Sequence, residues 1–303
     1  MSEVSEGGRG ESEVDQESAA ALEPPSNGSA PPIQELIITL VGEYVTDDEP
    51  IWSGGLVLLL EELGFSPAAS RIALGRVVSR NLLTRSKDGR RVFYRATPRL
   101  RHLLTDGHRQ TFWFRYPVAP WDGAWTFVWY AIPEERLLAR RRLSRRLSFM
   151  GFGALQDGTW FTPRDRAADV QRTVEGLEVT PYVVVLVGRA PDWVDAAAMV
   201  ARGWDVEELQ RRYAAFLDEF GHLNRPGATS GLTPREAFLA RTRVLEAFRQ
   251  IASLDPKIAE DELLPPGPRW DAIECLNVVE AALRPGATEF VRTTCATDTD
   301  VDK

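Results

Sequence analysis

The sequence predicts an α+β fold with three parts: an N-terminal helical module that ends in a hairpin, a central unit of strands and helices, and a C-terminal helical region. Apolar residues recur at helical spacing in residues 33–45 and again after Pro67. Asp88-Gly89, between two β-type runs, is a strong hairpin signal. Strand-like and helical patterns alternate between residues 126 and 190, and only helical patterns follow Gly203.

Length and composition limit the classes of protein. A chain of 303 residues with 44% hydrophobic content can form two or three domains. No apolar run approaches the ~18 residues of a membrane span, and the acidic start lacks the pattern of a signal peptide. Cys275 and Cys295 form no CxxC pair and fit a reduced interior. We therefore expect a cytoplasmic protein without a membrane partner.

Positive charge is concentrated in one segment of an acidic chain. The formal net charge is -8, yet residues 66–115 hold twelve Lys or Arg residues and two acids, while residues 33–65 hold seven acids and no base. A basic module on an acidic body indicates a polyanionic partner such as nucleic acid. A charge run is also the ordinary composition of a solvated face, so charge alone leaves both interpretations open.

The N-terminal module has the element order of a winged helix-turn-helix. Residues 1–32 are acidic and poor in bulky apolar side chains, which predicts a disordered tail. A helix over residues 33–45, a short strand, and a helix that Gly64 ends come next. Ser66 as cap and Pro67 at the first helical position begin a third helix, and a two-stranded hairpin follows it. We predict a DNA-binding domain over residues 33–100.

The third helix and the hairpin tip supply the candidate DNA contacts. We expect the helix to bury Ala69, Ile72, Ala73 and Val77 and to enter a major groove with its other side. The planar guanidinium of arginine can bind the two acceptor atoms of guanine. Basic side chains at a hairpin tip can bind phosphates or enter a minor groove. The predicted DNA-binding residues are Ser66, Ser70, Arg71, Arg76, Arg80, Lys87, Arg90 and Arg91. The alternative is a winged helix that binds protein, with arginines that only solubilise it.

Several blocks of the chain together resemble one known family. They include "IWSGGLVLLLEELGFSPAASRIALGRVVSRNLLTRSKDGRRVFYRATPR", "WDGAWTFVWYAIPEE", "LSFMGFGALQDGTWFTPRD" and "LDPKIAEDELLPPGPRW". In this order, and over residues 33–291, they resemble the PaaX family of bacterial transcriptional repressors. Members of this family regulate phenylacetate catabolism. The resemblance implies a homodimeric repressor on double-stranded operator DNA. It also implies release by a small-molecule effector, an acyl-CoA thioester such as phenylacetyl-CoA.

The central part predicts a compact α+β unit. A linker helix and connection over residues 101–122 lead into a ferredoxin-like domain over residues 123–203. Its first strand covers residues 126–132, and the run at residues 182–190 is expected to be a buried strand. The helix between them is expected to direct four leucines inward, namely Leu137, Leu138, Leu143 and Leu147.

The alternative function is a metal-dependent nuclease. The central domain of the PaaX family is similar to a small CRISPR-associated nuclease, in which an aspartate after the first strand holds the metal. Here Tyr130 is followed by Ala131, which cannot bind a cation. No common catalytic motif is present, so we expect no enzyme, no catalytic residue, no cofactor and no metal. The basic run at residues 140–146 is either a solvated helix face or a phosphate contact.

The last part of the chain is predicted to be helical. Residues 204–295 carry amphipathic patterns, and the final helix is expected to end before Pro285-Gly286. By analogy with the family, this region is an effector and dimerisation domain. Residues 296–303 are expected to be a disordered tail. The sequence does not identify the effector-binding residues.

Overall fold

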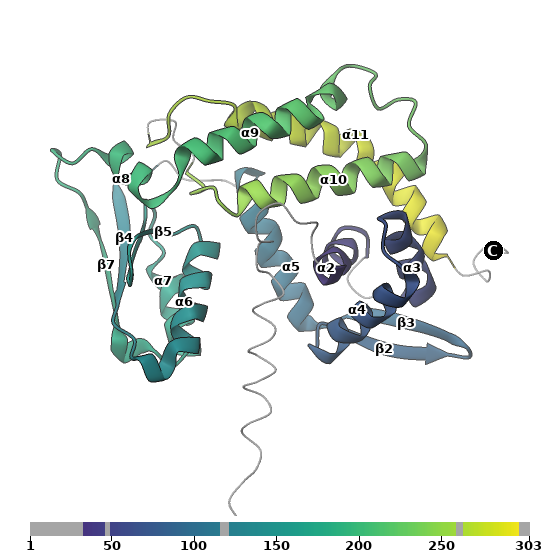
Figure 1. Ribbon diagram of the computed structural model, residues 1–303, viewed down its shortest axis with the longest axis horizontal. Coiled ribbons are helices and arrows are strands. Elements are labelled where there is room, and N and C mark those ends of the chain that lie inside the picture. Colours follow the sequence, from purple (N-terminus) through teal and green to yellow (C-terminus); the bar gives the residue numbers. More distant parts are fainter. Residues whose placement is uncertain (1–32, 46–48, 116–120, 259–262, 297–303) are drawn as a thin grey trace, which may run out of the picture. The chain divides into compact units, whose positions relative to one another are not determined.

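The computed structural model describes residues 33–45, 49–115, 121–258 and 263–296 (Figure 1). The predictions for residues 1–32 and for the tail after Ala296 lie outside this part. The chain forms two compact units. Unit 1 consists of the residues up to Gly107, Leu223–Glu246 and the residues from Asn277 onward. Unit 2 consists of His108–His222 and Ala247–Leu276. Both contain helices and a small sheet, which confirms the α+β class. Among the described residues, no helix combines the length and apolarity of a bilayer span.

Unit 1 begins with the predicted order of helix, short strand, two helices and a hairpin. The three strands form an antiparallel sheet in the order β1-β3-β2. The elements are α2 (Ile33–Tyr44), β1 (Ile51–Trp52), α3 (Ser53–Glu62), α4 (Pro67–Ser79), β2 (Leu83–Asp88), β3 (Arg91–Ala96) and α5 (Pro98–Thr111).

The core of unit 1 includes side chains from the end of the chain. Ile37 of α2 and Leu56 of α3 are buried in one cluster with Phe238 of α10 (Pro234–Ala252) and Val291 of α11 (Arg269–Cys295). Helix α11 therefore continues past Pro285, and the predicted end before this residue is wrong. A proline inside a helix costs about 3 kcal/mol, but here the residues beyond it gain burial in the core.

A buried arginine joins three helices of unit 1. The side chain of Arg241 is only 1% exposed; its guanidinium donates to Glu43 Oε2 at 2.6 Å and to Glu280 Oε1 at 2.8 Å. It also lies over the ring of Tyr44, 4.9 Å from the centroid. Burial opposes its positive charge, but the interactions with Tyr44, Glu43 and Glu280 outweigh that cost and raise its pKa. Arg241 thus connects α10 to both α2 and α11.

Unit 2 contains a four-stranded antiparallel sheet in the order β5-β6-β4-β7. Strands and helices alternate as β-α-β-β-α-β, which is the ferredoxin-like arrangement predicted from the sequence. The elements of this sheet and its helices are β4 (Ala124–Tyr130), α6 (Leu137–Phe149), β5 (Gly153–Gln156), β6 (Thr159–Thr162), α7 (Ala167–Gly176) and β7 (Val183–Arg189). The other helices of unit 2 are α8 (Ala196–Gly203) and α9 (Val206–Phe220), with short 3-10 turns at Trp113–Arg115, Glu134–Arg136, Thr180–Tyr182 and Gly221–Asn224.

Two burial predictions in unit 2 are wrong. Leu143 and Leu147 of α6 are buried, but Leu137 and Leu138 are exposed. The position one turn before Leu143 is Ala139, which packs on the same core, so the first two leucines lie off the buried face. Strand β7 is an edge strand, and several of its apolar side chains are exposed rather than buried: Val184, Leu186 and Val187.

Replacing Arg241 by methionine is expected to lower the free energy of unfolding by about 3 kcal/mol, because Glu43 and the buried Glu280 lose their shared cation. Urea unfolding followed by circular dichroism measures this change. The control is Arg243→Met, which removes an exposed arginine of the same helix and is expected to cost less than about 0.5 kcal/mol. Equal stabilities of the two variants would show that the buried arginine does not support unit 1.

Candidate nucleic-acid interface

Helix α4 begins at a capped N-terminus. The Ser66 hydroxyl accepts a hydrogen bond from the backbone N–H of Ala69 at 3.3 Å, and Pro67 occupies the first helical position, as predicted. Since Pro67 has no N–H to leave unsatisfied, the first turn forms at little cost. The cap fixes where the helix starts and therefore which residues face outward.

The buried side of α4 is formed by Ala73, Leu74 and Val77, which pack into the core of unit 1. Ile72 was expected on this side, but it is 59% exposed. It lies five residues before Val77, a rotation of about 140° around the helix. Ile72 therefore belongs to the outer face, and Leu74 takes the inner position that the sequence analysis missed.

The outer face of α4 follows the helical repeat without interruption. All of its members are exposed, and none is acidic: Ala68, Arg71, Ile72, Gly75, Arg76 and Ser79. Gly75 lies in the middle of the helix, and a Cβ atom added there would meet no atom of the described residues within 4 Å. Glycine in a helix interior is less stable than alanine by roughly 0.5–1 kcal/mol. The part of the chain that the structure describes therefore gives no packing reason for a glycine at this position.

Two predicted contact residues are not available to DNA. Ser70 is fully buried, and its hydroxyl donates to the Ser66 carbonyl at 3.0 Å. Arg80, at the end of α4, is also buried, and its Nη1 donates to Gln34 Oε1 of α2 at 2.9 Å. Both residues fall on the helical face that packs inward, so we correct the prediction: they support the position of α4 and lie outside the candidate interface.

The β2–β3 hairpin is the segment that the sequence predicts to be the wing, and we keep this name for it. Asp88 pairs with Arg91 at its end, and Gly89 has a φ of +57°, which glycine adopts without strain. Every residue of β2 after Leu83 is exposed, and the hairpin extends beyond the helices of unit 1 (Figure 1). Its outward residues include the predicted Lys87 and Arg90, with Arg91 half-buried.

Two further arginines of the wing escaped the sequence analysis. Arg85 of β2 and Arg95 of β3 are exposed as well. Both could have been predicted, because they are further basic residues in the two strands of the predicted hairpin. The wing and the outer face of α4 together, which we call the basic face, thus present many N–H donors and one acid, Asp88.

The chemistry of the basic face suits binding rather than catalysis. Guanidinium and ammonium groups recognise anionic oxygens and the acceptor edges of bases. Within the described residues, no group of three or more His, Cys, Asp or Glu side chains could hold a metal ion. Ala131, directly after β4 in unit 2, supplies no ligand in the position where the alternative nuclease would need a carboxylate.

Three family models match successive parts of the chain. Residues 33–100 match the model described as PaaX-like protein, residues 118–200 match the PaaX protein central Cas2-like domain, and residues 204–293 match the PaaX-like protein C-terminal domain. The first match contains the whole basic face.

Two individual proteins are similar over most of the chain. The transcriptional repressor PaaX of Escherichia coli (strain K12) is 29% identical over 266 residues, which cover 84% of this chain and 82% of the repressor. The structure of the uncharacterized protein Rv0674 from Mycobacterium tuberculosis has a TM-score of 0.52 and 19% identity over 86% of this chain and 96% of that one, a likeness of fold alone. With three matching domain models in the same order and this repressor as a relative, the chain belongs to the PaaX family of transcriptional repressors.

Proposed function

We propose that this protein represses transcription by binding double-stranded operator DNA through the basic face. The observation that supports this most is the outer face of α4, where Arg71 and Arg76 flank Ile72 and Gly75 without an acid among them. An α-helix fits the major groove, where arginine can pair with guanine and an exposed isoleucine can contact a thymine methyl group. The wing would contact phosphates on the flank of the helix.

Gly75 adds a steric argument for close contact. Since its own fold would tolerate a methyl group there, the missing side chain leaves room for something outside the chain. A helix that lies deep in a groove needs such a position, because each side chain holds the helix backbone away from the base edges. The glycine therefore supports insertion of α4 rather than loose electrostatic contact.

We further propose a cytoplasmic homodimer that an acyl-CoA thioester such as phenylacetyl-CoA releases from DNA. Two winged helices in a dimer would read two half-sites of an operator. An effector lowers operator affinity when it binds more tightly to a state of the protein that is incompatible with DNA. The family resemblance supports this scheme, and the acidic charge of the rest of the chain keeps that part away from DNA.

Replacing Arg71 or Arg76 by alanine is expected to weaken binding to a duplex from the promoter of the neighbouring genes by about 1–3 kcal/mol each, if each side chain reads a base. Fluorescence anisotropy titration with this duplex and a scrambled one measures the change. Arg202→Ala, which removes an exposed arginine of α8, serves as the control and should bind like the wild type. Unchanged affinity of both helix variants would remove α4 from the interface.

The Gly75→Ala variant separates stability from binding. We expect it to stabilise the fold by roughly 0.5–1 kcal/mol, because the new methyl group contacts none of the described residues. It should still weaken operator binding, because the methyl group would meet DNA. Gly107→Ala in α5, where an added Cβ also meets nothing, should stabilise without any effect on DNA. Tight operator binding by Gly75→Ala would contradict close insertion of α4.

Replacing Lys87, Arg90 and Arg91 together by glutamine is expected to flatten the salt dependence of DNA binding. Each phosphate contact contributes about 0.9 to the slope of log affinity against log salt concentration, so the slope should fall by up to about 3. The matched control replaces Arg141, Arg145 and Arg146 of α6. If the control flattens the slope and the wing variant does not, the phosphate contacts lie in unit 2.

A further inference from the structure

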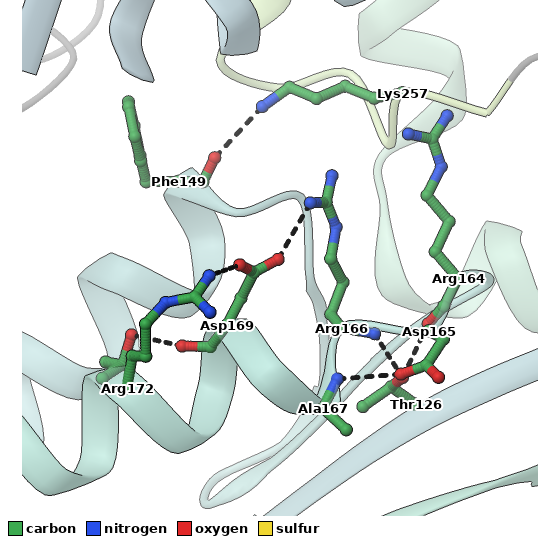
Figure 2. A network of polar contacts seen from close by, with 10 residues as sticks. Thr126, Phe149, Arg164, Asp165, Arg166, Ala167, Asp169, Arg172 and Lys257 are labelled. Atoms are coloured by element: carbon green, nitrogen blue, oxygen red, sulfur yellow. Dashed lines mark hydrogen bonds and ion pairs between the residues drawn. The ribbon is translucent and has the colours of Figure 1, made fainter. Parts of the chain in front are cut away.

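A threonine of unit 2 holds two arginines in a fixed position. Thr126 of β4 is fully buried; its hydroxyl donates to the carbonyl of Arg164 at 2.6 Å and accepts from the backbone N–H of Arg166 at 3.0 Å. Both arginines lie in the connection from β6 to α7. Figure 2 shows their guanidinium groups extending to the same side, toward the segment that carries Lys257.

Lys257 lies in a second segment, which is also fixed by hydrogen bonds. Its backbone N–H donates to the carboxylate of Asp255. This carboxylate also accepts from Nε and Nη2 of Arg269 and from the hydroxyl of Tyr213, the last at 2.7 Å. Its φ of +61° is rare and strained for a lysine. The residue is 3% exposed, and its ammonium group donates to the carbonyl of Phe149, the last residue of α6, at 3.1 Å.

The three cationic groups oppose one another. Burial lowers the pKa of Lys257 most, the nearby Asp255 raises it, and the positive charges of Arg166 and Arg164 lower it further, to about 7. The Nε–H of Arg166 is buried and has no acceptor among the described residues. Asp169 accepts from Arg166 at 3.0 Å, but it also binds Arg172 (Figure 2). An anion between the two segments would relieve this repulsion.

We propose that Arg164, Arg166 and Lys257 form a phosphate-binding site in unit 2. Two guanidinium groups and an ammonium group are the donor types that bind the oxygens of a phosphate monoester. The ligand would be a small molecule with a phosphate group. As the effector of the proposed repressor, an acyl-CoA provides such groups, and this part of the inference rests on the proposed function.

Binding of a phosphate at this site would change the pKa of Lys257, which a cluster with only a structural role would not show. A bound dianion favours the charged form of Lys257 and raises its pKa. At pH 8, which is above the Lys257 pKa of about 7, binding would therefore take up a proton from the buffer. At pH 6, where the ammonium group is already mostly charged, the protein would take up almost no proton.

Isothermal titration with adenosine 3′,5′-bisphosphate, inorganic phosphate and adenosine tests the site. We expect the two phosphate compounds to bind and adenosine to fail. In two buffers of different ionisation enthalpy, net proton uptake should be seen at pH 8, where the phosphate groups are already dianions. At pH 6 the uptake should be replaced by net release, because a phosphate monoester with a second pKa of about 6 loses its proton when it binds as the dianion. Arg164→Gln and Arg166→Gln should each weaken binding of the bisphosphate by at least about tenfold. Lys257→Met should remove the proton uptake.

The control variant is Arg141→Gln, an exposed arginine of the same unit with the same loss of charge, which should bind like the wild type. Arg164 is half-exposed, so its variant decides the question even if Lys257→Met fails to fold. Absence of phosphate binding by the wild type, or equal binding by Arg164→Gln and Arg141→Gln, would overturn the site.

A second readout separates this inference from the proposed function. Arg164→Gln should bind operator DNA as the wild type does in the absence of ligand, and acyl-CoA should no longer release it. Phosphate binding by a wild-type protein that ignores all duplexes would leave the site in place and refute the repressor function. Normal release of Arg164→Gln from DNA by acyl-CoA would show that the effector does not use these side chains.

Discussion

The candidate interface depends on the packing of one helix. A helix of the length of α4 can bury one side, and Ala73, Leu74 and Val77 fill that side in the core of unit 1. The cap at Ser66 fixes the first turn, and the helical repeat then determines the direction of every later side chain. Arg71 and Arg76 face outward for that reason. The burial of Arg80 and Ser70 strengthens the same orientation through contacts inside unit 1.

The C-terminal helices share the core on which this orientation depends. Phe238 and Val291 pack with the residues of α2 and α3, and Arg241 joins Glu43 to Glu280. Helices α10 and α11 also contribute residues to unit 2, which holds the proposed phosphate site. A ligand that changes these helices would thus act on elements that also contribute to the core of unit 1. In the proposed release from DNA, the effector would act through these two helices.

Much of the fold followed from local patterns. The capped start at Ser66, the hairpin at Asp88-Gly89 and the alternation of strands and helices in unit 2 are each set by short stretches of sequence, and the structure confirms them. Ile72 and Leu138 were misplaced because each lies in a run where several apolar residues compete for one buried face. Only contacts with other elements decide such a competition.

The remaining differences come from long-range packing. Helix α11 passes Pro285 because the residues beyond it are buried among helices more than two hundred positions earlier in the chain. The proposed phosphate site could not be predicted from the sequence, since Thr126, Arg164 and Lys257 are distant in the chain and none belongs to a motif. The sequence does carry a signal for Gly75, because a glycine in the middle of a helix destabilises the helix and therefore indicates a role outside the fold.

Hydrogen exchange of the full chain with and without operator duplex tests the central claim most directly. The account predicts slower exchange of backbone amides in α4 and in the β2–β3 wing when DNA is bound, with α6 of unit 2 unchanged. Protection confined to unit 2, with α4 and the wing exchanging as in the free protein, would contradict it.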